Sequence, residues 1–453
     1  MRSKEFSGLS GFRGTVRVPG DKSIAHRIVI ASALARTPCT VTNFPTNDDC
    51  LRTISAFKRL GIAVTGDLDR QDSTKIVVRG KGLSGLRRSG RPVHAGESGT
   101  TFRLLLGVLA GQRFSTVLTA GPMLSRRPMA RVTAPLRRMG ARIISRTSAT
   151  RTRPALKDTE EYPPVTVRGG LLRPITYRLA VASAQVKSAI LLAGLYAHGF
   201  TRVIEPVKTR DHTERILALF KADIKTRGRV IVIRGGRTLS APGKFAIPGD
   251  ISSASFFIVL GLLAKDSRIL IKDVSLNPSR TGVLRVLRRM GAHIKVTQSQ
   301  CCRVAGGEPI GNIEVRTSRL RATTVTKDEI PSLIDELPIL MVAACFARGR
   351  SVFQAVEELR VKETDRIASM VKNLAKMGAK IRVAGLCRRE DMVIQGVPYL
   401  KGAKVKSFQD HRTAMSMIVA GLCATGKTSI DDTTCISKSF PGFLKTLASL
   451  TSK

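Results

Sequence analysis

The feature that most constrains the fold is a short phrase that recurs along the chain. It reads KRLGIAV at 58–64, RRMGARI at 137–143, RRMGAHI at 288–294 and AKMGAKI at 375–381. Each copy has the pattern of a helix end, a residue suited to a left-handed turn, and the start of a β-rich run. A degenerate copy at 220–226 has Lys221 in the glycine's place, and a last helix near 443–450 would be a sixth copy without its strand. Copies about 70 to 90 residues apart predict a fold of repeated units.

Six apolar stretches run in phase with these copies. We expect helices to begin near Ser23, Ser98, Ser183, Ser252, Ser332 and His411, because a serine hydroxyl suits a helix N-cap. Stretches such as AILLAGLYA and FFIVLGLLA are hydrophobic on all sides, which indicates burial among other elements. Each unit is therefore predicted as strand, apolar helix, strand, amphipathic helix and further strand. Six units predict an α/β protein with two similar domains of three units each.

The two domains are expected to interleave in the sequence. VPGD at 18–21 resembles IPGD at 247–250, and Pro and Gly interrupt the repeat pattern near 244–249. We interpret both phrases as crossings between the domains, so that the first strand belongs with the second half. The predicted domains are residues 22–246, and residues 1–21 together with 247–453, with a ligand cleft between them.

The charge is strongly unbalanced: 76 Lys and Arg against 33 Asp and Glu give a formal net charge of +43. Such a balance suggests a polyanionic partner. However, the cations are spread from end to end, and only 4% of residues are aromatic, with no Trp to stack on bases. We therefore expect weak polyanion binding at low salt and no specific nucleic acid.

Apolar segments and cysteines indicate the compartment. The longest apolar stretches, 256–264 and 337–347, are too short to span a bilayer, and no apolar signal segment follows the first residues. The eight cysteines, at 39, 50, 301, 302, 345, 387, 423 and 435, form no CxxC pair and no His-spaced ligand pattern. Neither a disulfide framework nor a metal site is expected. These features predict a soluble, cytoplasmic protein that does not bind membranes.

Cations stand near the starts of the amphipathic helices. The phrases are SRRPM at 125–129 (with Pro128 expected at the first helical position), TRDHTER at 209–215, NPSR at 277–280, VKETDR at 361–366 and SKSFP at 437–441. Positive charge is disfavoured there by the helix dipole unless an anion lies nearby. At any single helix, ordinary solvated charge is an equally good interpretation. The recurrence favours a cleft that accepts a multiply anionic small substrate.

Five motifs then carry a resemblance to a known family. VPGDKSIAHR at 18–27, SAQVKSA at 183–189, RDHTE at 210–214, LRVKETDR at 359–366 and DHRTAMS at 410–416 follow one another over essentially the whole chain. Together they resemble the 5-enolpyruvylshikimate-3-phosphate synthases (3-phosphoshikimate 1-carboxyvinyltransferases) of class II. The resemblance implies two domains, each of three βαβαββ repeats in an inverted, barrel-like α/β arrangement.

The resemblance also implies a reaction. The enolpyruvyl group of phosphoenolpyruvate passes to the 5-hydroxyl of shikimate 3-phosphate, releasing phosphate, in the shikimate pathway to chorismate and the aromatic amino acids. No metal or organic cofactor is implied, and the expected protein is a monomer.

Residue roles follow from the same resemblance. Shikimate 3-phosphate would be bound by Lys22, Ser23, Arg27, Ser183, Ala184, Gln185, Arg210, Asp335 and Lys362. Phosphoenolpyruvate would be bound by Lys22, Gly99, Arg127, Gln185, Arg366, Arg412 and Lys438. The implied catalytic residues are Asp335, which takes the hydroxyl proton, Glu363, which protonates the methylene carbon, and Lys22. From the residues alone, Ser23 could equally be an N-cap and Glu363 a first-turn helix acid.

Three positions depart from the family's pattern or refine it. Glu97 stands where Asn is usual, so it would either repel an anionic donor or point away from it. NPSR at 277–280 has Ser where Thr is usual. Gly99 stands where Ala accompanies glyphosate tolerance, so the resemblance implies a glyphosate-sensitive enzyme.

Two other functions remain open at this point. The sister enzyme that uses UDP-N-acetylglucosamine as acceptor shares the repeats and the donor, but it carries Lys–Asn in place of Lys22–Ser23, and commonly a loop cysteine that is absent near 125–128. A basic nucleic-acid-binding protein on the same fold is the second alternative. Phosphate release with each acceptor, and salt-sensitive RNA binding, would discriminate them.

Overall fold

The computed structural model describes residues 3–68, 74–148, 160–298, 307–385 and 389–451. The chain divides into two compact units. Unit 2 consists of Lys22–Ile247 with Val304–Gly307, and unit 1 of Met1–Asp21, Pro248–Arg303 and Glu308–Lys453. Each unit has a hydrophobic core of its own.

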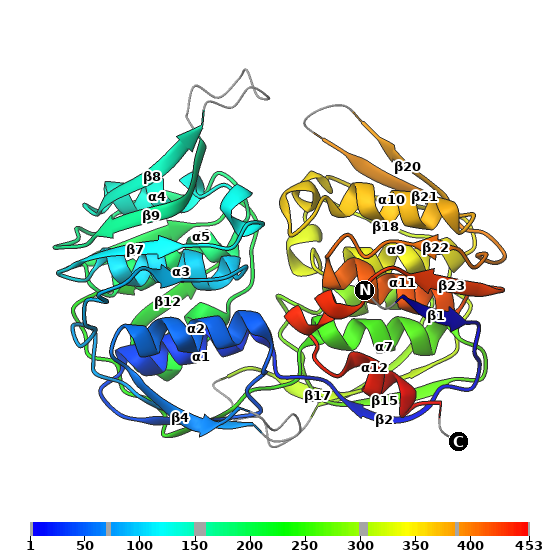
Figure 1. Cartoon of the computed structure of the whole chain (residues 1–453), viewed down its shortest axis with the longest axis horizontal. Helices are drawn as coiled ribbons and strands as arrows, with labels where there is room; N and C mark the ends of the chain where they lie inside the picture. The colour runs from blue at the N-terminus through cyan, green and yellow to red at the C-terminus, as the bar shows by residue number, and fades with distance from the viewer. Residues whose placement is uncertain (1–2, 69–73, 149–159, 299–306, 386–388, 452–453) are drawn as a thin grey trace. The chain divides into compact units, whose positions relative to one another are not determined.

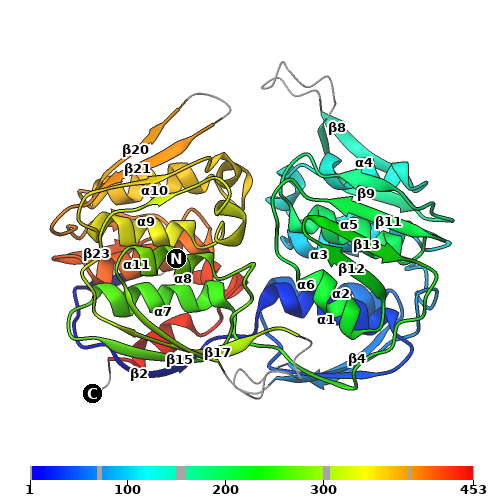
Figure 2. The ribbon, with the colours of Figure 1, turned by 180° about the vertical axis from the view of Figure 1, so that it is seen from behind.

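Unit 2 contains three repeats, each with an apolar helix, an amphipathic helix and a four-stranded sheet. Its elements are α1 (Lys22–Leu34), β3 (Cys39–Thr42), α2 (Asp48–Arg59), β4 (Ala63–Asp67), β5 (Lys75–Arg79), β6 (Val93–His94), α3 (Gly99–Ala110), β7 (Ser115–Thr119), η1 (Leu124–Arg126), α4 (Ala130–Arg138), β8 (Arg142–Ser148), β9 (Glu160–Arg168), β10 (Thr176–Arg178), α5 (Ala184–Gly194), β11 (Phe200–Ile204), α6 (His212–Leu219), β12 (Asp223–Arg227), β13 (Val230–Arg234) and β14 (Lys244–Ala246). The sheets have the orders β14-β3-β5-β4, β6-β7-β9-β8 and β10-β11-β13-β12. Figure 2 shows β11, β13 and β12 as neighbours in the third of these sheets.

Unit 1 repeats this plan with a smaller last sheet. Its elements are β1 (Lys4–Ser7), β2 (Arg13–Arg17), α7 (Ile251–Leu263), β15 (Arg268–Ser275), α8 (Gly282–Arg289), β16 (His293–Gln298), β17 (Ile310–Arg316), β18 (Thr324–Val325), η3 (Ile330–Ser332), α9 (Leu337–Phe346), β19 (Arg350–Phe353), η4 (Glu357–Val361), α10 (Arg366–Lys376), β20 (Lys380–Ala384), β21 (Asp391–Gln395), β22 (Lys404–Val405), α11 (His411–Leu422), β23 (Lys427–Ile430), η5 (Thr434–Lys438) and α12 (Phe443–Ala448). The sheets have the orders β16-β17-β15-β2, β18-β19-β21-β20 and β1-β23-β22.

The two N-terminal strands belong to sheets formed mainly by the second half of the chain. β2 pairs in parallel with β15, and β1 pairs antiparallel with β23. Figure 1 shows the dark-blue β1 and β2 among the green-to-red elements of unit 1. In the same way, β14 pairs in parallel with β3, about 200 residues earlier in the chain. Each unit therefore needs segments from distant parts of the sequence to complete its sheets.

The recurring phrase forms the predicted helix-to-strand turn in every copy. Its glycines, Gly61, Gly140, Gly291 and Gly378, have φ between +85° and +108°. Lys221 takes the same place between α6 and β12 with φ +65°, a conformation that a residue with a side chain rarely adopts. The turn geometry is therefore kept even where the glycine is lost.

The predicted serine caps are correct for two helices and wrong for two others. The hydroxyls of Ser98 and Ser183 accept hydrogen bonds from backbone N–H groups in the first turns of α3 and α5. For α7, however, Asp250 is the cap and accepts from the N–H of Ser252, since a short carboxylate satisfies the same orphan amide. Ser332 lies in η3, and α9 begins only at Leu337, where a proline in the second helical position needs no amide partner.

The fold class predicted from the repeats is confirmed. The described strands form six separate sheets and no closed barrel, and each unit has three repeats around its own core. No helix among the described residues is long and apolar enough to cross a membrane.

Candidate active site

In unit 2, the first turns of α1 carry Lys22, Ser23 and Arg27. Lys22 Nζ lies 2.8 Å from a carboxylate oxygen of Asp49 on α2. Arg27 is almost fully buried, with a side chain that reaches across to two other helices. Its Nε donates to Thr213 on α6 (2.6 Å), and its Nη2 donates to the Ser188 hydroxyl on α5 (2.9 Å). The guanidinium is therefore fixed between the helices whose starts carry Arg210 and Ser183.

A second group of predicted residues meets where α3 and α5 begin. The Gln185 side chain accepts from Arg103 Nη1 (2.6 Å) and donates to the Thr100 hydroxyl (3.0 Å), which ties α5 to α3. A Cβ placed on Gly99 would lie 3.1 Å from Nη1 of Arg127, so the guanidinium packs directly against this glycine. Gly99, Arg127 and Gln185 therefore share one neighbourhood, and Arg103, which sequence reasoning missed, connects them.

Two further predicted residues lie next to the N-caps of α5 and α6 in the sequence. Ala184 is the first residue of α5, directly after its Ser183 cap. Arg210 is half-buried in the loop that precedes α6. Both therefore stand at helix starts, as the motifs predicted.

Glu97 does not stand as an open acid beside these groups. Its carboxylate accepts hydrogen bonds from the backbone N–H groups of Leu124 (2.7 Å) and Met123 (3.3 Å), at the start of η1. It therefore caps the turn that leads to Arg127. The expectation for Pro128 was wrong, because α4 begins only at Ala130.

In unit 1, four predicted residues converge at the starts of α9, α10 and α11. Asp335 lies 3.5 Å from Nη1 of Arg366 and 3.6 Å from Nη2 of Arg412. Arg366 is buried and contacts Glu363 through Nη2 (2.6 Å) and Asp410 through Nε (2.9 Å). Arg412 Nη1 also donates to the backbone carbonyl of Asp335 (3.0 Å). The two proposed proton-transfer carboxylates therefore share one guanidinium.

The remaining two predicted residues of unit 1 are lysines. Lys362 precedes this cluster, and burial lowers the pKa of its ammonium, while Asp335 acts in the opposite direction. Lys438 ends η5, where its ammonium donates to the backbone carbonyl of Gln409 (3.1 Å). Both lie in segments that precede a helix of unit 1.

The two arginines of the unit 1 cluster are paired with carboxylates of the chain itself. Arg366 contacts Asp335, Glu363 and Asp410, and Arg412 contacts Asp335. Sequence reasoning missed Asp410, which also caps α11, although the motif DHRTAMS contains it. An acid directly before His–Arg at a helix start was the available signal.

Arg280, from NPSR, corrects the expectation of an open cation at this helix start. Its side chain is buried and contacts Asp21, Asp250 and Ser252. Here the anion that neutralises the cation near the helix start is the chain's own.

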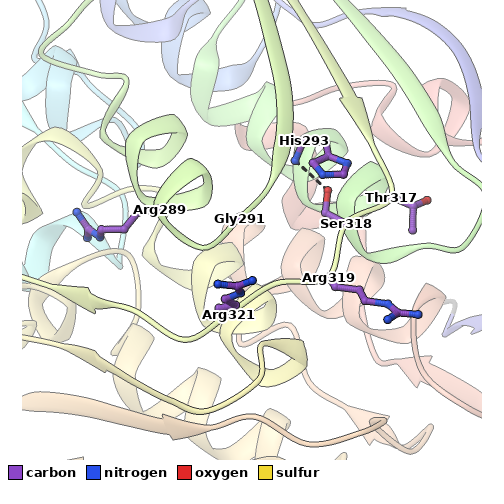
Figure 3. A pocket seen from close by; sticks show the side chains of 7 residues that line it. All are labelled: Arg289, Gly291, His293, Thr317, Ser318, Arg319 and Arg321. Atoms are coloured by element: carbon purple, nitrogen blue, oxygen red, sulfur yellow. Dashed lines mark hydrogen bonds between the residues drawn. The ribbon is translucent and has the colours of Figure 1, made fainter.

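A pocket of about 650 Å³ in unit 1 is separate from all the predicted residues. Figure 3 shows its lining at the end of α8, the start of β16 and the segment after β17: Arg289, Gly291, His293, Thr317, Ser318, Arg319 and Arg321. Arg289 is engaged by both carboxylate oxygens of Glu329, at 2.9 and 3.2 Å. This pocket therefore adds no residue to the candidate site.

The chain is similar to known proteins over nearly its whole length. Residues 7–447 match the family model for EPSP synthase (3-phosphoshikimate 1-carboxyvinyltransferase). The 3-phosphoshikimate 1-carboxyvinyltransferases of Shouchella clausii and Desulforudis audaxviator are 45% and 47% identical, each with 97% of both chains covered. The EPSP synthase structure from Acinetobacter baumannii matches with a TM-score of 0.83 and 38% identity, over 99% of this chain and 98% of that one. The enolpyruvyl transferase NikO from Streptomyces tendae, at 19% identity and a TM-score of 0.73 over 99% of this chain and 97% of that one, shares the fold.

Proposed function

The chain belongs to the EPSP synthase family, and from this premise we propose how its residues divide the work of the family's reaction. It is a 3-phosphoshikimate 1-carboxyvinyltransferase of the shikimate pathway. It transfers the enolpyruvyl group of phosphoenolpyruvate to the 5-hydroxyl of shikimate 3-phosphate and releases inorganic phosphate. A UDP-N-acetylglucosamine transferase and a nucleic-acid-binding protein are not favoured, since the match to this family extends over nearly the whole chain.

Both units contribute to both substrates in this proposal. Shikimate 3-phosphate is held by the α1, α5 and α6 residues of unit 2, with Asp335 and Lys362 from unit 1. Phosphoenolpyruvate takes Lys22, Gly99, Arg127 and Gln185 from unit 2, and Arg366, Arg412 and Lys438 from unit 1. Planar guanidinium groups suit its carboxylate and phosphate, because each can donate two parallel hydrogen bonds.

The observation that carries the proposal is the contact of Asp335 and Glu363 with the same guanidinium, that of Arg366. The oxygen of the 5-hydroxyl bonds to C2 of phosphoenolpyruvate while Asp335 accepts the hydroxyl proton. At the same time Glu363 delivers a proton to C3. The tetrahedral adduct then loses a proton from C3 and breaks the C2–O bond to phosphate, which restores the double bond.

The paired state of the cluster suggests how Glu363 obtains its proton. Its 2.6 Å contact with Arg366 favours the carboxylate form in the absence of substrate. An incoming dianion competes for the same guanidinium and adds negative charge, and both effects favour a protonated Glu363. We infer that donor binding prepares the acid.

Phosphate release with both substrates, and with each omitted in turn, tests the reaction. UDP-N-acetylglucosamine as acceptor should give no phosphate. Asp335→Asn and Glu363→Gln should each lower kcat by roughly 10²-fold or more, the usual scale for loss of a general acid or base. Asp328→Asn is the matched control, since Asp328 is exposed on the loop before η3. Full turnover by Glu363→Gln would show that another group is the proton donor.

The compartment and oligomeric state complete the proposal. We infer a cytoplasmic monomer. Among the described cysteines, Cys39, Cys345, Cys423 and Cys435 are free thiols, as suits a reducing compartment. Sedimentation equilibrium at micromolar concentration should give the mass of one chain.

A further inference from the structure

Lys187 is a fully buried lysine of α5 to which the substrate-binding assignments give no role. Its side chain is 0% exposed and lies one helical turn after the Ser183 cap, within the motif SAQVKSA. Its ammonium is 2.6 Å from a carboxylate oxygen of Glu214, on α6, and 3.1 Å from one of Glu205, directly after β11. All three residues belong to unit 2. One cation therefore joins three separate segments of this unit.

Glu205 connects the ammonium to the loop that leads to α6. The carboxylate oxygen that faces Lys187, Oε1, also accepts from the backbone N–H of Thr209 (3.1 Å) and from the Thr209 hydroxyl. Thr209 is buried, and Arg210, one of the proposed shikimate 3-phosphate-binding residues, follows it directly. A single carboxylate therefore links Lys187 to the segment that carries Arg210.

The other acid, Glu214, holds the far end of the same segment. It lies in the first turn of α6. Beside this ion pair, the hydroxyls of Ser188 and Thr213 are 2.6 Å apart, and both accept from the guanidinium of Arg27. The segment 205–214 is therefore held at both ends by side chains of α5.

A buried lysine with two buried carboxylates is an unfavourable way to fill a core. Three charged groups leave water, whereas an apolar side chain of similar volume would fill the space without that loss of solvation. Burial raises the pKa of the Glu214 carboxyl, and Lys187 acts in the opposite direction. The ion pairs supply a directional contact with Glu205, and through it with the Thr209 amide, that an apolar side chain could not make. The geometry therefore favours a role in placing the loop.

We propose that Lys187 is a positioning residue for substrate recognition, because its ammonium, through Glu205, fixes the segment that presents Arg210 to the phosphate of shikimate 3-phosphate. This inference rests on the proposed function, in which Arg210 belongs to the shikimate 3-phosphate site, and a guanidinium fork suits a phosphate group. Loss of the ammonium should therefore weaken the binding of shikimate 3-phosphate. The binding of shikimate, which has the same ring and no phosphate, should be nearly unchanged.

The test measures the Kd of shikimate 3-phosphate, the Kd of shikimate and the Tm of full-length Lys187→Met, with both Kd values taken by calorimetry below the unfolding transition. The control is Ile233→Ala in the buried face of β13, which creates a cavity in the same unit. For Lys187→Met we expect the Kd of shikimate 3-phosphate to rise by about tenfold or more and that of shikimate to change by less than about threefold. Ile233→Ala should lower the Tm and leave the ratio of the two Kd values as in the wild type, because a loss of stability alone does not distinguish the ligands.

A second comparison tests whether the effect passes through Arg210. Arg210→Gln should itself weaken the binding of shikimate 3-phosphate selectively. In the Arg210→Gln background, Lys187→Met should add less than about threefold, because two residues that act through one contact are not additive.

Three results would overturn the inference. They are an unchanged Kd of shikimate 3-phosphate in Lys187→Met, an equal loss for both ligands, and effects of Lys187→Met and Arg210→Gln that multiply in the double variant. If Lys187→Met is insoluble, Lys187→Met/Glu214→Gln, which removes one cation together with one buried acid, is judged by the same criteria. A wild-type enzyme that releases no phosphate from the two substrates would instead refute the proposed function, so the two failures are distinguishable.

Discussion

Replacing Glu97 with Gln should weaken the use of phosphoenolpyruvate, although the change removes a negative charge near an anion site. The structure gives the reason: the carboxylate accepts the N–H groups of Met123 and Leu124 at the start of η1, and Arg127 follows directly after this turn. Glu97 also packs so closely on Gly121 that a Cβ there would lie 2.3 Å from its Oε1. Glu97 is thus part of the support for the Arg127 loop.

The size of the effect follows from these two bonds. Hydrogen bonds to a charged acceptor contribute about 1.5–3 kcal/mol, and those to a neutral one about 0.5–1.5 kcal/mol. The 2.7 Å bond to Leu124 counts fully, whereas the 3.3 Å bond to Met123 is weak. Gln keeps an acceptor of the same shape, so it should cost about 1 kcal/mol, whereas Ala removes the acceptor and should cost about 2–3 kcal/mol. These energies correspond to KM increases of roughly fivefold for Gln and roughly 30- to 140-fold for Ala.

The assay is steady-state phosphate release with phosphoenolpyruvate varied at saturating shikimate 3-phosphate. Glu5→Gln on the exposed β1 of unit 1 serves as the charge-matched control. The direction of the change decides between the two interpretations of Glu97. A KM that falls in Glu97→Gln would mean that the carboxylate repels the donor, and the capping argument would then be wrong.

Three further outcomes follow from single positions. Gly99→Ala places a Cβ 3.1 Å from the Arg127 guanidinium, so half-inhibition should require at least tenfold more glyphosate, while the Tm stays unchanged. A wild-type enzyme that resists glyphosate would contradict the reasoning. Lys221→Gly removes a side chain at φ +65° and should raise the free energy of unfolding by about 1 kcal/mol, measured in urea against Gly291→Ala, which should lower it. Burial and the neighbouring Asp21 raise the pKa of Asp250 to about 6. Between about pH 4 and 6 the folded state therefore holds a proton that the unfolded state has released. The free energy of unfolding should fall by on the order of 2–3 kcal/mol as pH rises through this window, and Asp250→Asn should abolish that fall.

Repetition made the fold predictable from the sequence. Each phrase such as RRMGARI encodes a helix end, a left-handed residue and a strand start within seven residues, so local chemistry suffices to place it. Lys221 shows that even the degenerate copy keeps the turn. The prediction that a helix begins near Ser332 was wrong, because Ser332 ends the 3-10 helix η3 and α9 begins five residues later, at Leu337. Such a helix start is set by packing rather than by the cap residue alone.

The sequence motifs name the residues of the candidate site, but they do not give the contacts between these residues. Arg366 and Glu363 are three residues apart, so their contact is local in the sequence. In contrast, the partners of Arg27 on α5 and α6 are about 160 and 190 residues away, and no periodicity in the sequence relates them. Arg103 was missed for the same reason, since its role appears only when α3 and α5 are brought together.

The electrostatic argument from the sequence held only in part, and the difference bears on function. A cation at a helix start needs an anion nearby, but the sequence does not say whether the anion is a substrate or a carboxylate of the same chain. At α8 the chain's own acids meet Arg280, and at α10 and α11 Asp410, Glu363 and Asp335 meet the arginines. In the proposed function, substrate binding in unit 1 is therefore an exchange of anions on guanidinium groups that are already paired. In this proposal the released carboxylates stay beside the substrate, where Glu363 takes up the proton that it later donates to C3 and Asp335 accepts the proton of the 5-hydroxyl. In the mechanism that we propose, the ion pairs that neutralise these arginines before substrate binds are thus also what prepares the site for proton transfer.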